Sequence, residues 1–107
     1  MARLDWPYTS QALSTTAETE LLELFATFGT GYRGMTFAVY SSAVAGTATL
    51  KYIEPGGGER ILTTMAIPAG GNDGTVIDLD FSMPQVKLYV TMDSGSATTL
   101  TAEGMIY

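Results

Sequence analysis

The stretch that decides the fold is Gln85-Val-Lys-Leu-Tyr-Val-Thr-Met92, in which apolar and polar side chains alternate without interruption. One side of this stretch carries Val86, Leu88, Val90 and Met92, and the other carries Lys87, Tyr89 and Thr91. Successive side chains of a β-strand point to opposite faces of its sheet. The period of two therefore predicts a half-buried strand whose apolar face packs into a core.

Similar runs occur on both sides of this stretch, separated by glycine-rich turns about every eight to twelve residues. The expected strands are Met35–Ser41, Thr47–Ile53, Arg60–Ile67, Thr75–Phe81, Gln85–Met92 and Ala97–Tyr107. Short strands at this spacing are typical of an all-β protein. We expect a single β-sandwich of about seven to eight antiparallel strands, with a jelly-roll or immunoglobulin-like topology.

The segment Glu18–Phe28 fits two periods. Leu21, Leu24, Phe25 and Phe28 would share one face of a helix, and Thr15 and Glu18 have the spacing of a capping box. The same segment also alternates as a strand, with Leu22, Leu24, Ala26 and Phe28 on one side. We favour the strand, because pairing with the next run is the simpler arrangement in an otherwise all-β chain.

Residues 1–16 show no period and are mostly polar, which predicts an extended N-terminal arm in front of a sandwich domain at 17–107. The arm is either a loose tail or a segment that docks on a neighbouring subunit. Large aromatic side chains are favoured anchors of interfaces. The candidate partner-binding residues of the arm are Leu4, Trp6, Pro7 and Tyr8.

Composition narrows the classes of partner. Apolar residues make up 46% of the 107 residues and charged residues only 15%, which leaves surface suited to self-assembly. The net charge of −6 repels nucleic acid and anionic lipid, so we expect neither as a direct partner. The N-terminus has no apolar core of signal-peptide length, and no apolar run of membrane-spanning length occurs, which predicts synthesis in a cytosol.

Catalytic chemistry has few candidates. The chain contains no histidine and no cysteine, which excludes Ser-His-Asp and Cys-His devices. Asp78 and Asp80 lie two apart on an expected strand, with Cβ atoms about 7 Å apart. That spacing falls within the range of inverting glycosidases, yet any acidic pair on one strand face produces it. We expect a solvated pair, no enzyme activity and no cofactor.

Asn72, Asp73, Asp78 and Asp80 could offer oxygen atoms to a Ca²⁺ ion. Their spacing does not match an EF-hand loop, and Asn72-Asp73-Gly74 is typical of a turn. We therefore expect no metal site.

Two further motifs have structural interpretations. Gly56-Gly57-Gly58 lacks the Gly-Lys-Ser/Thr of a phosphate-binding loop and predicts a hairpin loop. Glu18, Glu20 and Glu23 form an acidic edge, which is either a solvated face or a patch that meets basic residues of a partner.

From Met35 to Tyr107 the chain resembles small virion proteins of tailed bacteriophages. The residues that carry the resemblance are Val39-Tyr-Ser-Ser42, Ala45-Gly-Thr-Ala-Thr-Leu50, Ile67-Pro-Ala-Gly70 and Val86–Thr91. The resemblance implies a β-sandwich that coats a capsid or belongs to a tail or fibre, usually as an oligomer and without catalytic residues. Where members of the group often have Asp-Gly after the third strand, this chain has Pro55-Gly56-Gly57-Gly58, which leaves its subgroup open.

Together these observations predict a capsid decoration (cement) protein, made in the host cytoplasm and placed on the capsid surface of the virion. Its expected partners are the major capsid protein and further copies of itself, with a trimer favoured over a dimer. The alternative is a receptor- or glycan-binding module of a tail or fibre. That module would use the loops Gly56–Gly58 and Gly70–Gly74 and the tyrosines Tyr32, Tyr40 and Tyr89.

Overall fold

Eight β-strands follow one another along the chain in the computed structural model, which describes residues 7–25, 34–70, 74–80 and 83–107. The strands are β1 (Tyr8–Leu13), β2 (Thr19–Phe25), β3 (Met35–Ser41), β4 (Gly46–Ile53), β5 (Glu59–Ile67), β6 (Thr75–Leu79), β7 (Gln85–Met92) and β8 (Thr98–Ile106). Within these described ranges, no helix is long and apolar enough to cross a membrane.

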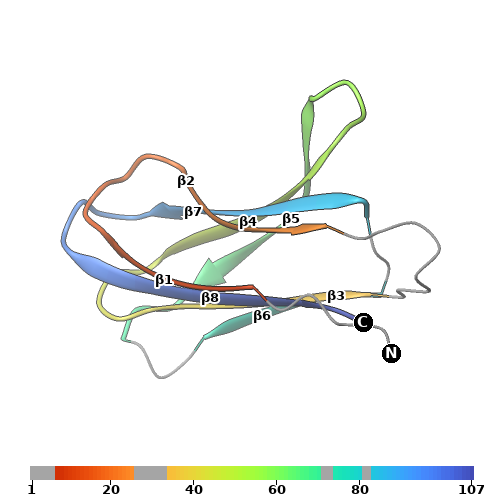
Figure 1. The fold of residues 1–107 in the computed structure, drawn as a ribbon. Coiled ribbons are helices and arrows are strands. Elements are labelled where there is room, and N and C mark those ends of the chain that lie inside the picture. The colour runs from red at the N-terminus through yellow and green to blue at the C-terminus, as the bar shows by residue number, and fades with distance from the viewer. Residues whose placement is uncertain (1–6, 26–33, 71–73, 81–82) are drawn as a thin grey trace.

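The strands form two four-stranded sheets that lie face to face (Figure 1). Sheet A has the order β1-β8-β3-β6, sheet B has the order β2-β7-β4-β5, and all neighbours are antiparallel. Each of the pairs β1/β2, β3/β4, β5/β6 and β7/β8 passes from one sheet to the other, which is the double Greek key of a jelly roll. The predicted β-sandwich is confirmed, and of the two expected topologies the chain adopts the jelly roll.

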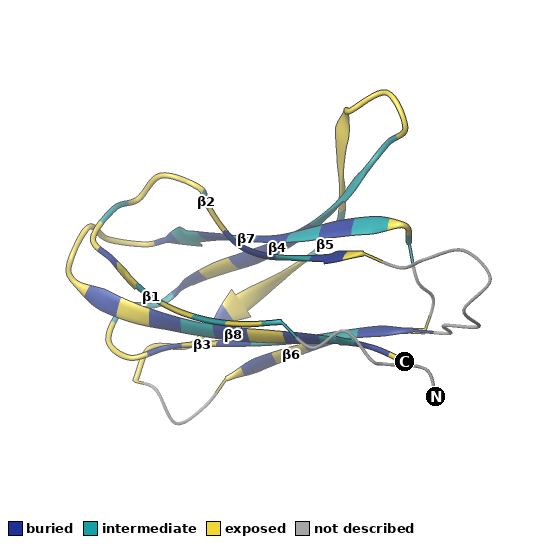
Figure 2. Cartoon of the chain, in the orientation of Figure 1, coloured by how far each residue is buried: buried dark blue, intermediate teal, exposed yellow. Residues whose placement is uncertain are grey.

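The core lies between the sheets and is built from the alternating positions of the strands (Figure 2). Phe37, Leu50 and Leu88 are completely buried there. Burying one side chain of this size contributes roughly 1.5–3 kcal/mol. The four apolar residues expected to face the core on β7 are buried, as are alternate residues of β3 and β8: Met35, Phe37, Val39, Val86, Leu88, Val90, Met92, Thr98, Leu100, Ala102 and Ile106.

Strand β2 settles the ambiguous segment in favour of the strand. It pairs with β7, and a register shift between Glu20 and Leu22 leaves Leu21 without an opposite residue. A bulge of this kind lets two adjacent residues turn inward, so Leu21 and Leu22 are both buried. Phe25, which the helix would have placed on its apolar face, is 52% exposed.

Strand β1 corrects the predicted boundary of the arm. Residues 8–13, within the range 1–16 expected as arm, pair with β8 from Tyr8 opposite Glu103 to Leu13 opposite Thr98. The inward side chains of β1 include the polar Thr9 and Gln11, so the sequence of this segment shows no apolar alternation. Its backbone nevertheless forms a regular edge strand. The sandwich therefore begins at Tyr8 and not at residue 17.

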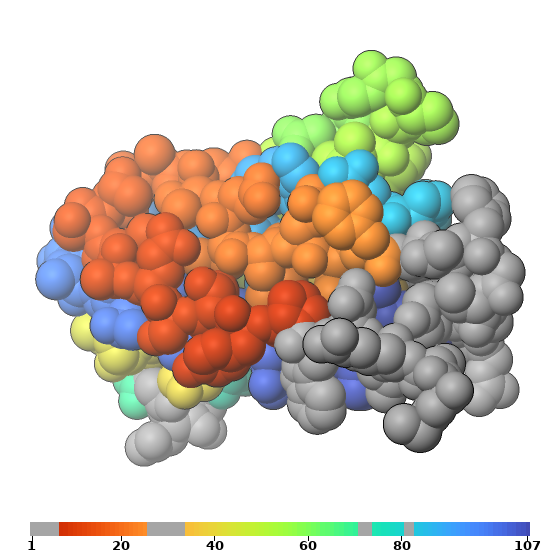
Figure 3. Space-filling model, viewed as in Figure 1, coloured from red at the N-terminus to blue at the C-terminus, as the bar shows by residue number. Residues whose placement is uncertain are grey.

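The hairpin of β4 and β5 projects beyond the rest of the sandwich (Figures 1 and 3). Gly57 takes a positive φ of 91° in the turn of this hairpin. There the amide of Glu54 donates to the carbonyl of Gly58, and the amide of Gly57 donates to the carbonyl of Glu54. The glycine run is thus the predicted hairpin loop. A register shift between Leu50 and Lys51 changes the side on which β5 presents its residues. Ile61 pairs with Lys51 and stays 63% exposed instead of joining Ile67 in the core.

Candidate functional site

The outer face of sheet A brings two tyrosines to the two sides of its central strand β8. In the register of the sheet, Tyr8 on β1 lies opposite Glu103, and Tyr40 on β3 lies opposite Thr101. Directly opposed residues in antiparallel strands have Cβ atoms about 4.5–5.5 Å apart. Glu103 also lies opposite Ala38 of β3. Ala38 therefore lies between Glu103 of β8 and Val76 of β6, two residues before Tyr40 on the same face.

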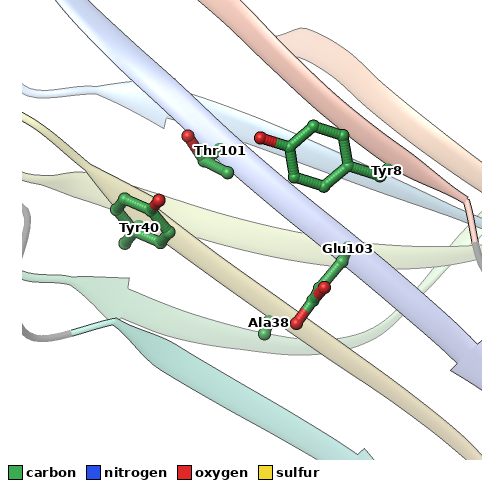
Figure 4. A pocket seen from close by; sticks show the side chains of 5 residues that line it. All are labelled: Tyr8, Ala38, Tyr40, Thr101 and Glu103. Atoms are coloured by element: carbon green, nitrogen blue, oxygen red, sulfur yellow. The ribbon is translucent and has the colours of Figure 1, made fainter.

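These five residues line a depression of about 240 Å³ (Figure 4). Tyr8 is 66% exposed and Tyr40 is 41% exposed, so each ring offers much of its surface to solvent. Figure 4 shows the two rings on opposite sides of the β8 ribbon, with Thr101 and Glu103 projecting from that ribbon. We name this depression the tyrosine site and take it as the candidate functional site.

The electrostatics of the two outer faces differ. Among the described residues, the cationic side chains are Lys51, Arg60 and Lys87, and all three belong to strands of sheet B. Sheet A carries the exposed acidic residues Glu103 and Asp78. In its described part the surface around the tyrosine site is therefore neutral or negative, which disfavours anionic ligands.

The acidic edge expected at β2 forms ion pairs on the outer face of sheet B. Lys51 Nζ lies 2.7 Å from Glu18 Oε1, and Lys87 Nζ lies 3.2 Å from Glu20 Oε1 and 3.9 Å from Glu23 Oε2. The carboxylates raise the pKa of Lys87, chiefly through its bond to Glu20. The sequence had left open a solvated face or a patch for a partner, and the structure adds that the three glutamates pair with lysines of the same chain.

Tyr89, one of the predicted stacking residues, is part of that network. Its hydroxyl donates to the Glu59 carboxylate, and Lys51 Nζ lies 4.5 Å from the centre of its ring. Partial burial raises the pKa of Tyr89, as do the bond to Glu59 and the nearby carboxylates. Tyr89 is partly buried, with Lys51 over its ring, whereas Tyr40 is 41% exposed and is the more accessible of these two predicted stacking residues. Tyr32 lies outside the described residues.

Of the carboxyl pair Asp78 and Asp80, Asp78 has a structural role. Thr36 Oγ1 and the Tyr107 hydroxyl donate to Asp78 Oδ1 over 2.7 Å and 2.9 Å. These bonds, led by that of Thr36, hold the pKa of Asp78 below its usual 3.8. A carboxyl group that acts as a general acid near neutral pH needs a raised pKa. The geometry thus ties Asp78 to the stability of sheet A.

The oxygen donors considered for Ca²⁺ are only partly described. Residues 7–25, 34–70, 74–80 and 83–107 contain no group of three or more acidic side chains that could hold an ion. Asn72 and Asp73, two of the four oxygen donors considered for Ca²⁺, lie outside the described residues.

The predicted arm residues divide into two groups. Leu4 and Trp6 lie outside the described residues. Pro7 is partly buried, and its carbonyl accepts the amide of Gly104 over 3.1 Å. Tyr8 starts β1 and lines the tyrosine site. Sequence reasoning missed Ala38, Thr101 and Glu103, because their proximity depends on the pairing of β3 and β1 with β8.

Comparison with known proteins adds evidence about the fold. No protein-family model and no curated protein sequence matches the chain. Among solved structures, a mitogen derived from Yersinia pseudotuberculosis matches with a TM-score of 0.62 and 8% identity, over 96% of this chain and 86% of that one. The SPBc2 prophage-derived protein YomS matches with a TM-score of 0.60 and 13% identity, over 99% of this chain and 96% of that one.

A third structure, of infectious bursal disease virus strain Gx, matches with a TM-score of 0.49 and 14% identity, over 97% of this chain and 30% of that chain. The first two matches show that the whole sandwich, with both of its sheets, occurs in other proteins of similar size.

Proposed function

We propose that the chain is a structural protein of a phage virion, and more specifically a capsid decoration (cement) protein on the head surface. The observation that carries the proposal is the end-to-end similarity in fold to a prophage-derived protein, at 99% coverage of this chain and 96% of the other. Jelly rolls recur in viral capsid domains. The resemblance of Met35–Tyr107 to small phage virion proteins supports the same class.

The projecting edge strand β5 supports an assembled state. Ile61 is 63% exposed and Met65 is 40% exposed on this edge. An edge strand with unpaired backbone groups and exposed apolar side chains is suited to contact another chain. We assign β5, together with Leu4, Trp6 and Pro7, to contacts with further copies and with the major capsid protein. A trimer is favoured over a dimer.

The proposed mechanism is stabilisation of the shell by mass action. A protein that binds the assembled shell and not its free subunits shifts the equilibrium toward the shell. The proposal includes no reaction, no cofactor, no nucleic acid and no membrane as a partner. The net charge of −6 and the pairing of Lys51 and Lys87 with glutamates agree with that assignment.

The test uses virions of the phage whose genome encodes the chain. Heads that lack the protein are mixed with purified protein and sedimented, and the oligomeric state of the protein is measured in the same preparation. We expect saturable binding at a fixed ratio to the major capsid protein. Heads that leave the protein in the supernatant at every concentration would refute the decoration role.

Two variants make the test specific. Deletion of residues 1–6 removes Leu4 and Trp6 and leaves β1 whole, and Ile61→Lys places a charge on the edge of β5. Each is expected to weaken binding to heads. The matched control is Val76→Lys on β6, where an equally exposed side chain (59%) lies outside the assigned contacts.

The tail or fibre module stays the second candidate, and the tyrosine site is the observation that favours it. The two candidates differ in what loss of the gene does. If the chain is a decoration protein, loss of its gene leaves adsorption intact and makes heads fragile to heat or low salt. If it is a receptor-binding module, loss of its gene leaves heads stable and abolishes adsorption.

A further inference from the structure

The rings of Tyr8 and Tyr40 are exposed on a face where the chain gains little from them. Tyr8 lies on the edge strand β1 and is 66% exposed, and Tyr40 is 41% exposed. A tyrosine ring has an apolar face and a polar hydroxyl edge, so it suits a ligand that also has an apolar face and a polar edge. A sugar ring has that division, because its C–H groups form apolar patches and its hydroxyls project around the rim.

The polar side chains beside the two tyrosine rings can form hydrogen bonds with the hydroxyl groups of a sugar. Glu103 and Thr101 project from β8 next to Tyr8 and Tyr40 (Figure 4). A carboxylate is an acceptor with two oxygens, and a threonine hydroxyl both donates and accepts. Hydrogen bonds to an ionised acceptor are about twice as strong as neutral ones. A ligand rich in hydroxyls supplies the donors that Glu103 requires.

The size of the depression sets the scale of the ligand. Its volume of about 240 Å³ is below the roughly 300–1,000 Å³ of pockets that hold drug-sized molecules. Ala38 leaves the space open, since a longer side chain at that position would fill the gap between Tyr40 and Glu103. The site therefore suits one sugar residue of a glycan rather than a long segment.

The charge of the face selects among sugars. Glu103 lines the site, and the described cations are on sheet B. A sugar that carries a carboxylate, sulfate or phosphate is repelled by this surface. We infer that the tyrosine site binds a neutral saccharide residue, stacked on Tyr8 and Tyr40 and hydrogen-bonded to Glu103 and Thr101. This function is independent of whether the chain sits on the head of a virion.

A basic side chain is the competing ligand, because aromatic rings with a carboxylate also attract cations. Such cation–π contacts are strongest where the cation is removed from water. The open rings of this site leave a bound cation hydrated, which favours the saccharide. The experiment includes both ligand classes.

The experiment is a titration of the isotopically labelled full chain, followed by the shifts of its backbone amides. The probes are methyl glycosides of glucose, galactose and N-acetylglucosamine, with methyl glucuronide as the anionic probe and arginine methyl ester as the cationic one. We expect at least one neutral glycoside to give saturable shifts at Tyr8, Tyr40, Thr101 and Glu103, with a dissociation constant in the millimolar range. Methyl glucuronide is expected to bind more weakly than methyl glucoside.

Variants then test each contact. Tyr8→Ala and Tyr40→Ala are each expected to weaken binding by about tenfold, and Glu103→Gln is expected to weaken it severalfold. Tyr40→Phe keeps the ring and is expected to retain most of the affinity. Phe25→Ala is the matched control, because Phe25 is an exposed aromatic residue of the other sheet.

The outcomes separate the alternatives. Absence of saturable shifts with every neutral glycoside, with a folded spectrum, overturns the inference. It is also overturned if arginine methyl ester binds at these residues while the sugars do not, or if Phe25→Ala weakens sugar binding as much as Tyr8→Ala. If Tyr8→Ala fails to fold, Tyr40→Leu decides the role of the rings, because it keeps an apolar side chain on the same strand.

Discussion

The two sheets of the sandwich secure their side chains by different chemistry. Sheet A relies on hydroxyl groups, with Thr98 bonding several groups at the end of β3 and Thr36 bonding Asp78. Sheet B relies on charge, with Lys51 paired to Glu18, which directly precedes β2, and Lys87 paired to Glu20 of β2. The difference teaches that the described cations serve the stability of sheet B. The described outer face of sheet A presents acidic and aromatic side chains, among them Glu103, Tyr8 and Tyr40.

The hydroxyl cluster at Thr98 is buried and links three segments. Thr98 Oγ1 lies 2.6 Å from Ser41 Oγ and accepts the amides of Ala43 and Val44 over 3.0 Å and 3.3 Å. One threonine of β8 therefore fixes the connection from β3 to β4, where the chain passes from sheet A to sheet B.

The largest effect is expected from breaking this cluster. Thr98→Val keeps the shape of the side chain and removes the acceptor, so the amide of Ala43 and the hydroxyl of Ser41 lose their partner. A buried donor or acceptor left without a partner costs about 1–3 kcal/mol. We expect the free energy of unfolding, measured with urea, to fall by an amount of that size. Thr99→Val, one residue along and exposed, is the control and is expected to change stability by less than about 0.5 kcal/mol. Equal effects of the two substitutions would contradict the assignment.

A smaller effect is expected from the charges of sheet B. Lys51→Met keeps the length of the side chain and removes both the ion pair with Glu18 and the cation over the Tyr89 ring. We expect a loss of roughly 0.5–1.5 kcal/mol in the free energy of unfolding, decreasing as salt is added. Glu103→Gln on sheet A is the control and should be insensitive to salt. A Lys51→Met loss that is the same at low and high salt would show that packing, not charge, is responsible.

The contact between Asp78 and Tyr107 sharpens the comparison through pH. Because its pKa is lowered in the folded chain, Asp78 contributes stability above its usual pKa of 3.8, and this contribution is lost as the pH falls below that value. Tyr107→Phe removes one donor. We expect the variant to be less stable than the parent at neutral pH and equal to it in strong acid, measured by urea unfolding across that range. Tyr40→Phe is the control, and a Tyr107→Phe difference that grows in acid would be contrary to the prediction.

The smallest effect on stability is expected at the exposed edge of sheet B. Ile61→Ser replaces a side chain that is 63% exposed, so the unfolding free energy of the monomer should change by less than about 0.5 kcal/mol. Its association with further copies should weaken, which sedimentation at several concentrations measures. An unchanged association constant would remove β5 from the proposed contact.

Much of the fold could be predicted from single stretches. The alternation in Met35–Ser41 and Gln85–Met92 correctly identified which side of each strand enters the core, because an interface between two sheets admits only apolar groups in quantity. Strand β1 could not be predicted in this way. Its inward positions hold Thr9, Gln11 and Leu13, and only Leu13 joins the core, so the strand has no apolar alternation and is held mainly by its backbone ladder with β8.

The bulges were equally hidden from pattern analysis. One extra residue in β2 turns both Leu21 and Leu22 inward, and the shift opposite Leu50 turns Ile61 outward. A bulge changes which parity of positions faces the core, and its location depends on the partner strand. Local sequence carries the alternation but not the point at which it changes.

The sequence by itself determined the all-β class, the inward faces of the central strands and the restriction of cationic residues to a few positions. Only the tertiary structure decided that β8 lies between β1 and β3, and so that Tyr8 and Tyr40 line one depression with Thr101 and Glu103. The reason is physical: the period of two arises from the geometry of each strand alone. The neighbours of a strand are chosen by packing and hydrogen bonding between segments far apart in the chain.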